Sequence, residues 1–388
     1  MKQKQSDQQD EKGRRRRARF WRFLQIFAVP ILTKKYRYAC DRIELKGPYL
    51  LIANHAANFD PILMGIASPE PLTVVGSEHL ERLGFLTRLI HRFFSLIPRR
   101  KAASGRQTVI QILKALKQDQ PVLLFAEGEC TWDGVSAEIF PATGKLAKLA
   151  RVPLVTFRLQ GNYLAQPRWA KKARKGPISG RIVNVYSPEQ LGEMNADDVN
   201  DAINRDLFVD APSRAQLEGT KYRSRASAQG LEQALFICPA CQRIGVLRAE
   251  GDELSCDCGM RARLDQSGVF AEGPFVTIHD WDAWQRQTLE ELLGNDDAPT
   301  ELFPGSGKLT DCSDGTTREV RFSLDLSAQA IRIDGEAHPF SGISDIAMVK
   351  ASRLVFTADH TYYELFAKNA ILRPYLMAVQ ASQKGTER

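Results

Sequence analysis

The sequence predicts an α/β domain that follows an N-terminal interfacial helix and precedes a small cysteine-rich module and a β-rich C-terminal domain. Three observations support this. Short apolar runs alternate with helical stretches from Gly47 to about Val185, four cysteines cluster after residue 236, and period-two patterns recur from about residue 303. With 388 residues, 43% of them hydrophobic, the chain exceeds one ordinary core, so more than one folding unit is expected.

Residues 1–45 are expected to form a basic arm and a membrane-surface amphipathic helix. The chain carries a net charge of +7, and arginines crowd this arm at Arg14, Arg15, Arg16, Arg17, Arg19 and Arg22. Residues 20–32 add aromatic and aliphatic side chains, a mixture that favours an anionic membrane surface as the partner. This stretch is interrupted by Pro30 and is shorter than the roughly 20 apolar residues that cross a bilayer. The alternative is a disordered polar tail followed by a core helix.

The flanks of the apolar stretch bear on localisation. Lys34, Lys35 and Arg37 follow it without a small-residue cleavage site, which disfavours a signal peptide. We therefore expect a peripheral or monotopic protein on the cytoplasmic face of the cell membrane.

The α/β domain is expected over residues 46–215. Its apolar runs at 49–54 and 121–128 are continuous and end in polar or glycine residues, as buried strands do when they deliver a site at their tips. Further segments alternate between strand-like and helix-like patterns, at 61–68, 72–77, 108–117, 144–151 and 153–159. The chemistry is expected at the strand ends.

His55 follows the first of these strands, and Asp60 comes five residues later, just before an expected helix. Histidine titrates near neutrality and can take a proton from an alcohol when a carboxylate fixes its tautomer and stabilises the imidazolium. This pair therefore predicts general-base chemistry. The alternative for Asp60 is a helix N-cap ahead of Pro61.

Asn54, His55 and Asp60 match the NHxxxxD motif, and here the chain resembles the glycerophospholipid acyltransferase family, which includes the 1-acylglycerol-3-phosphate acyltransferases. Three further stretches resemble the following family blocks in order, at residues 93–116, 123–134 and 152–163. The resemblance thus covers roughly residues 47–165.

The resemblance implies catalysis by His55 and Asp60 and an acyl thioester of coenzyme A or acyl carrier protein as donor. The acceptor would be the free hydroxyl of 1-acyl-sn-glycerol 3-phosphate, giving phosphatidic acid in phospholipid biosynthesis. No catalytic cofactor and no covalent cysteine or serine is implied. The implied substrate-binding residues are Asn54, Arg99, Arg100, Glu127 and Gly128, with Arg99 against the acceptor's phosphate.

The third block departs from the family pattern. Ala126 replaces the usual proline, Glu129 stands where threonine is common, and Cys130 occupies a position often held by arginine. These changes leave open an acyltransferase for another lysophospholipid or a hydroxylated lipid. A further alternative is a non-catalytic, membrane-bound lipid-binding or adaptor protein, against which the intact His55 and Asp60 argue.

Residues 216–236 are interpreted as a linker with a helical part, and residues 237–275 as a cysteine module. Its four cysteines are spaced C-x2-C and C-x-C with fourteen residues between the pairs, a pattern that resembles a zinc ribbon: Cys238, Cys241, Cys256 and Cys258. Four thiolates would hold a structural Zn²⁺. Acidic residues and the lack of tryptophan and tyrosine in this segment argue against a nucleic-acid partner.

Residues 276–298 are expected to form a helical connector, and residues 299–388 a β-rich domain that ends in a helix. The period-two runs are separated by turn signals, and residues 371–382 are helical in pattern. This order predicts a small sandwich or barrel capped by one helix, which fits a pleckstrin-homology-like domain by analogy of fold.

Overall fold

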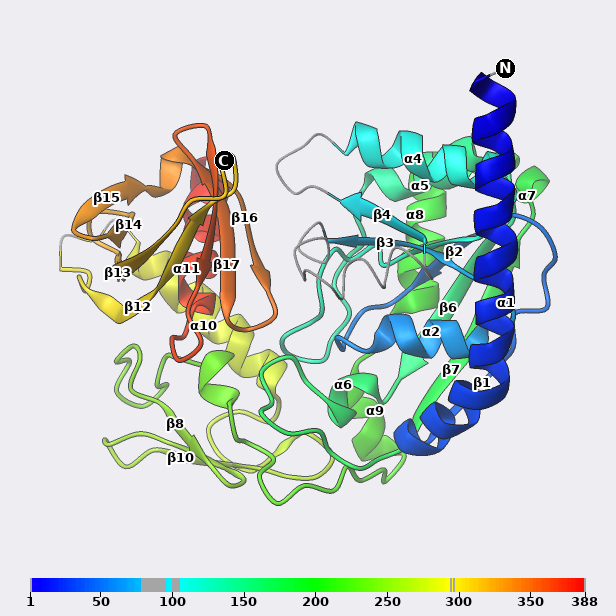
Figure 1. The fold of residues 1–388 in the computed structure, drawn as a ribbon. Helices are drawn as coiled ribbons and strands as arrows, with labels where there is room; N and C mark the ends of the chain where they lie inside the picture. Colours follow the sequence, from blue (N-terminus) through cyan, green and yellow to red (C-terminus); the bar gives the residue numbers. More distant parts are fainter. Residues whose placement is uncertain (1, 78–94, 100–104, 294, 296, 387–388) are drawn as a thin grey trace. The chain divides into compact units, whose positions relative to one another are not determined.

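A computed structural model describes residues 2–77, 95–99, 105–293, 295 and 297–386. The chain divides into two compact units, each described here by itself (Figure 1). Unit 1 comprises Met1–Pro167 and Lys175–Arg214, and unit 2 comprises Arg168–Arg174 and Ala215–Arg388.

Unit 1 is built on a sheet of seven strands in the order β1-β7-β6-β2-β5-β3-β4. All described neighbours pair in parallel except β6 and β7, which are antiparallel. The strands are β1 (Tyr38–Cys40), β2 (Leu50–Ala53), β3 (Thr73–Ser77), β4 (Ser95–Arg99), β5 (Val122–Leu124), β6 (Leu154–Gln160) and β7 (Ile178–Tyr186). The predicted α/β domain is therefore confirmed.

Helices cover both faces of this sheet, which is why its central strands are apolar throughout. Figure 1 shows α4 and α5 on one side of the sheet and α2 on the other. Side chains of α4, α5, α7 and α8 share one buried core with β2, β5 and β6. The helices that follow the first are α2 (Asp60–Ala67), α4 (Arg106–Lys117), α5 (Ala142–Ala150), α6 (Asn162–Ala165), α7 (Pro188–Glu193), α8 (Ala196–Leu207) and α9 (Ala211–Leu217).

The N-terminal helix α1 spans Lys2–Tyr36 and runs through Pro30. The sequence-based expectation that Pro30 breaks this segment was wrong. Proline removes the backbone hydrogen bond to the carbonyl of Ile26, but both residues lie on the exposed side of the helix, where water can bind that carbonyl. No helix in the described part of the chain is both long enough and apolar enough to span a bilayer.

The first part of unit 2 is a small antiparallel sheet with strand order β11-β10-β9-β8, followed by α10 (Ile278–Leu292). Thr277 and Asp280 form a capping box that fixes where this helix begins. The other elements are a short 3₁₀ helix, η2 (Leu231–Gln233), and the strands β8 (Arg248–Glu250), β9 (Glu253–Ser255), β10 (Arg261–Leu264) and β11 (Phe270–Glu272).

The remainder of unit 2 is an antiparallel sheet of seven strands in the order β15-β14-β13-β12-β18-β17-β16, packed against helix α11 (Arg373–Thr386). Tyr375 of α11 is fully buried and meets the ring of Phe322 edge-on. The elements are β12 (Leu302–Asp311), β13 (Thr317–Asp325), β14 (Ala330–Ile333), β15 (Glu336–Pro339), η3 (Phe340–Gly342), β16 (Ile343–Val349), β17 (Arg353–Ala358) and β18 (Thr361–Phe366). A β-domain capped by one helix is thus present.

Candidate active site

The predicted catalytic and substrate-binding residues that the structure describes gather at one edge of the unit 1 sheet, together with Asn162, which was not predicted. His55, Glu127 and Asn162 come just after β2, β5 and β6, and Arg99 is the last residue of β4. Carboxyl ends of parallel strands share one edge, so the strand order brings together residues that lie far apart in the sequence.

His55 and Asp60 form a direct pair. His55 Nδ1 lies 2.9 Å from Asp60 Oδ2, and the His55 side chain keeps 18% of its surface exposed while that of Asp60 is fully buried. An ionised carboxylate only accepts hydrogen bonds, so Nδ1 carries the proton and Nε2 is left as the basic nitrogen. The ring also stacks on Phe125, with 4.3 Å between ring centroids.

The Asp60 carboxylate is held by the loop between β2 and α2. Oδ2 also accepts the backbone N–H groups of Ala56 and Ala57, at 2.8 and 2.9 Å, and Oδ1 accepts the side-chain amide of Asn162 at 2.9 Å. Asp60 is the first residue of α2 but makes no capping bond forward into it. The alternative in which Asp60 is only an N-cap was therefore wrong.

Glu127 fixes the backbone of His55. Its Oε1 accepts the His55 N–H at 2.7 Å, and its Oε2 accepts the N–H of Ala137 at 3.0 Å. Burial raises the pKa of Glu127 to about 7, although the two backbone hydrogen bonds lower it. Both carboxylate oxygens of Glu127 thus hold backbone N–H groups, one of them that of His55, and a substrate contact by Glu127 stays a prediction.

Asn54 joins two strands. Its amide nitrogen donates to the carbonyl of Leu159 at 2.9 Å, and its amide oxygen accepts the N–H of Leu159 at 2.7 Å. The side chain is 2% exposed. Both polar groups of Asn54 are therefore used by β6, and a substrate contact by Asn54 stays a prediction.

Arg99 lies next to Gly128. A Cβ atom added to Gly128 would come 3.2 Å from Arg99 Nη1 and 2.5 Å from the ring of Phe140, and its φ of +86° also favours glycine. The Arg99 guanidinium carbon sits 4.2 Å from the centre of the Phe140 ring. Burial lowers the pKa of Arg99, which as a guanidinium stays charged. Arg100 lies outside the described residues.

Cys130 contacts the other ring nitrogen of His55. Its Sγ lies 3.3 Å from Nε2, and the cysteine is 6% exposed. Burial lowers the pKa of His55, but the Cys130 sulfur and the hydrogen bond and charge of Asp60 outweigh burial, so the His55 pKa is raised well above its usual value. From the sequence, Cys130 was interpreted only as a departure from the family pattern, and a nucleophilic role was not expected for it.

Pattern reasoning also missed Asn162 and Phe125. Asn162 lies in the stretch that resembles the fourth family block, and Phe125 lies in the stretch that resembles the third. Their places in these blocks were the sequence signal that could have identified them. Neither side chain belongs to a short motif with His55, from which each is separated by at least one strand.

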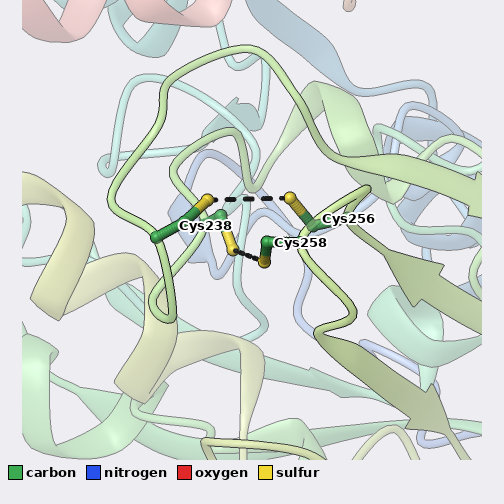
Figure 2. A group of neighbouring side chains, drawn as sticks. Cys238, Cys256 and Cys258 are labelled. Atoms are coloured by element: carbon green, nitrogen blue, oxygen red, sulfur yellow. Dashed lines mark hydrogen bonds between the residues drawn. The ribbon is translucent and has the colours of Figure 1, made fainter.

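The four predicted cysteine ligands meet in unit 2. Their sulfur atoms lie within 4.8 Å of one another, with 3.7 Å between Cys238 and Cys258 and 3.8 Å between Cys241 and Cys256. Figure 2 shows the labelled sulfurs turned toward a common centre. A tetrahedral zinc ion with bonds of about 2.3 Å would separate its sulfur ligands by about 3.8 Å, so the cluster fits this metal.

The backbone around each cysteine pair forms a tight turn. Cys238 N–H donates to Arg243 at 3.1 Å and Gln242 N–H donates to Cys238 at 2.8 Å. In the second pair, Gly259 has a φ of +99° and its N–H donates to Cys256 at 2.9 Å, between β9 and β10. These turns hold the thiols in place as metal-binding knuckles do.

Parts of the chain are similar to known proteins. Residues 34–160 match the family model described as Acyltransferase. A crystal structure of the 1-acyl-sn-glycerophosphate acyltransferase from Thermotoga maritima is similar at 15% identity and a TM-score of 0.40, over 49% of this chain and 79% of that one. The C-terminal PH domain of human FYVE, RhoGEF and PH domain containing protein 3 is similar at 15% identity and a TM-score of 0.18, over 21% and 86%. No curated protein sequence matches the chain.

Proposed function

We propose that residues 34–160, which match the acyltransferase family model, transfer a fatty acyl group from a thioester of coenzyme A or acyl carrier protein to 1-acyl-sn-glycerol 3-phosphate, giving phosphatidic acid. The observation that carries this proposal is the His55–Asp60 pair at the carboxyl edge of the sheet, with Nδ1 bound at 2.9 Å and Nε2 left basic. A hydroxyl is the acceptor that such a base activates.

His55 takes the proton of the acceptor hydroxyl as the hydroxyl oxygen attacks the acyl carbonyl. Asp60 stabilises the imidazolium that results, because its carboxylate is buried and already oriented by three other donors. The proton then passes to the departing thiolate. No metal or organic cofactor enters these steps.

Arg99 is the proposed partner of the acceptor's phosphate. A guanidinium meets phosphate oxygens through paired charge-assisted hydrogen bonds, which aim the neighbouring hydroxyl. The Arg99 guanidinium stacks on the ring of Phe140, and the lack of a side chain at Gly128 lets Phe140 and Arg99 lie close to the backbone there.

The test is acyl transfer by the purified full chain with labelled palmitoyl-coenzyme A or palmitoyl-acyl carrier protein and a panel of lysolipids. Wild type is expected to acylate lysophosphatidic acid, His55→Ala to be inactive, and His360→Ala, which changes an exposed histidine of unit 2, to match wild type. Transfer only to another lysolipid or hydroxylated lipid would replace the acceptor, a change that Glu129 and Cys130 in the third block favour. No transfer to any acceptor would refute the proposal.

Helix α1 is the proposed membrane contact. One face is docked on unit 1 through the Trp21 indole, which donates to Ser68 at 3.2 Å, and through Gln25, which donates to Gly65 at 3.0 Å. The opposite face carries exposed apolar side chains at helical spacing: Phe23 (54% exposed), Ile26 (65%), Phe27 (58%) and Ile31 (69%). Exposed basic residues flank this stripe at Arg16, Arg19, Arg22, Lys34 and Lys35.

An apolar stripe among basic residues suits the interface of an anionic bilayer, where rings enter the headgroup region and charges meet phosphates. We propose that the protein lies on the cytoplasmic face of the cell membrane. Flotation with phosphatidylglycerol vesicles should recover wild type, whereas Phe23→Ser/Phe27→Ser should stay in solution. Ile110→Ser, which removes an exposed apolar side chain elsewhere, is the control. Equal flotation of the double variant would exclude α1 as the contact.

The cysteine cluster is proposed to bind a structural Zn²⁺. A site filled by four thiolates has no open position for substrate, so its contribution is to folding. The segment around it is short strands and turns, which a metal would fasten together.

A further inference from the structure

The thiol of Cys130 contacts His55, the general base of the proposed reaction. Its Sγ is 3.3 Å from Nε2 of His55, whose Nδ1 is 2.9 Å from the Asp60 carboxylate. Sulfur, imidazole and carboxylate thus form one hydrogen-bonded chain. This is the arrangement that turns a thiol into a nucleophile, because the imidazole takes the thiol proton and the carboxylate stabilises the resulting charge.

Contacts on both sides of Cys130 tie its loop to His55. Glu127 accepts the His55 N–H at 2.7 Å, and the N–H of Thr131 donates to the His55 carbonyl at 3.1 Å. Cys130 lies between these two anchors, so the place of its thiol is set by bonds to the residue that would deprotonate it. The pair is preorganised rather than brought together by chance rotation of a surface side chain.

Cys130 also stands where the acceptor hydroxyl would have to stand in a direct reaction. Nδ1 of His55 is engaged by Asp60, which leaves Nε2 as the proton-accepting atom of the ring, and Sγ is already within hydrogen-bond distance of it. The first proton that His55 can take in this arrangement is therefore that of Cys130.

We propose that Cys130 is a catalytic nucleophile that carries the acyl group between the thioester donor and the lipid acceptor. This inference rests on the acyl transfer proposed above and adds a covalent intermediate to it. The reaction then has two half-reactions that use the same base.

In the first half-reaction His55 Nε2 removes the thiol proton, and the Cys130 sulfur attacks the carbonyl carbon of the donor thioester. The bond from that carbon to the donor sulfur breaks, and the donor thiolate takes the proton from the imidazolium. One thioester replaces another, so no oxidant or further reactant is needed. The products are acyl-Cys130 and the free carrier thiol.

In the second half-reaction His55 Nε2 removes the proton of the acceptor hydroxyl, and the hydroxyl oxygen attacks the carbonyl carbon of acyl-Cys130. The carbon–sulfur bond to Cys130 breaks, and the cysteine thiolate recovers the proton from His55. The acyl group leaves as an oxygen ester. Once the thiol has been acylated it no longer donates to Nε2, so the same nitrogen becomes available to the acceptor.

The test uses the full chain and needs no acceptor for its first readout. Wild type is incubated with palmitoyl-coenzyme A and labelled free coenzyme A, and the label entering palmitoyl-coenzyme A is measured. A covalent route predicts exchange, and Cys130→Ala should reduce it to the enzyme-free background. Cys312→Ala, which changes a thiol of unit 2, should exchange like wild type. Intact mass should show a palmitoyl adduct that neutral hydroxylamine removes, present in wild type and absent from Cys130→Ala.

Transfer to lysophosphatidic acid is then measured for the same proteins, with circular dichroism to confirm that each variant is folded. Cys130→Ser keeps the size of the side chain and is expected to trap an oxygen ester resistant to neutral hydroxylamine. Transfer by Cys130→Ala at the wild-type rate would overturn the inference and leave the proposed acyltransferase intact. An adduct that no lipid acceptor discharges would overturn the proposed function and, with it, the second half-reaction, while the first half-reaction would stand. The absence of exchange, adduct and transfer would overturn both.

Discussion

Replacing Asp60 by alanine should damage the fold of unit 1 as well as its chemistry. The carboxylate accepts hydrogen bonds from His55, Ala56, Ala57 and Asn162 and is fully buried. Alanine would leave these four donors without that acceptor. Each buried donor left unsatisfied costs about 1–3 kcal/mol, so the sum is roughly 4–12 kcal/mol, less where water enters.

That cost is comparable to the whole free energy of unfolding of a domain, about 5–15 kcal/mol. Asp60→Asn separates folding from catalysis. Its carbonyl oxygen can occupy the place of Oδ2 and keep three donors, while the amide of Asn162 can turn its oxygen toward the new NH₂ group. The expected stability loss is therefore only about 1–3 kcal/mol, whereas activity should fall by roughly 10³–10⁴-fold because the charge opposite the imidazolium is gone.

The assay is urea unfolding followed by circular dichroism, with acyl transfer measured on the same preparations. Asp41→Ala is the control, since this exposed carboxylate accepts one described hydrogen bond, from Ile182, and its loss should cost about 0.5–1.5 kcal/mol. If Asp60→Ala unfolds at the wild-type midpoint, the carboxylate does not hold the loop and the reasoning fails.

Three further perturbations test other parts of the chain. The pKa of Glu127 is raised to about 7 in the fold, so the stability that Glu127 contributes is fully present below the unfolded pKa near 4.5 and is lost as pH rises through 7. Urea unfolding should show that the free energy of unfolding of wild type falls by about 3 kcal/mol over this window relative to that of Glu127→Gln. Parallel pH curves for the two proteins would contradict this. Cys238→Ser should lower the zinc content found by metal analysis and the melting temperature of unit 2, whereas Cys312→Ser should change neither. A zinc content of Cys238→Ser equal to that of wild type would count against the site. Arg373 and Asp282 are each 1% exposed and paired at 2.7 Å. Arg373→Ala should therefore lower the free energy of unfolding by about 3–5 kcal/mol, and adding Asp282→Ala should recover part of that loss. Strictly additive losses would show that the two charges are not coupled.

Local pattern alone identified much of the site. His55 and Asp60 are separated by five residues of one loop, so their spacing in the chain already limits their distance in space. The same holds for Cys238 with Cys241 and for Cys256 with Cys258, where short turns set the geometry. The alternation of apolar runs likewise indicated an α/β domain, because strands buried on both faces must be apolar throughout.

Tertiary structure decided which distant segments meet at His55. Cys130 and Asn162 reach the His55–Asp60 pair because β2 lies between β5 and β6, a strand order that no local periodicity encodes. Residue patterns report which face of an element is buried, but not which element covers it. The course of α1 through Pro30 was decided in the same way, since Trp21 and Gln25 dock one face of the helix on unit 1 and leave the proline on the side open to water. The local sequence pattern therefore determined the elements and the His55–Asp60 pair. The packing of the sheet determined the distant partners of that pair, because those contacts span up to about a hundred residues and form only when the strands align.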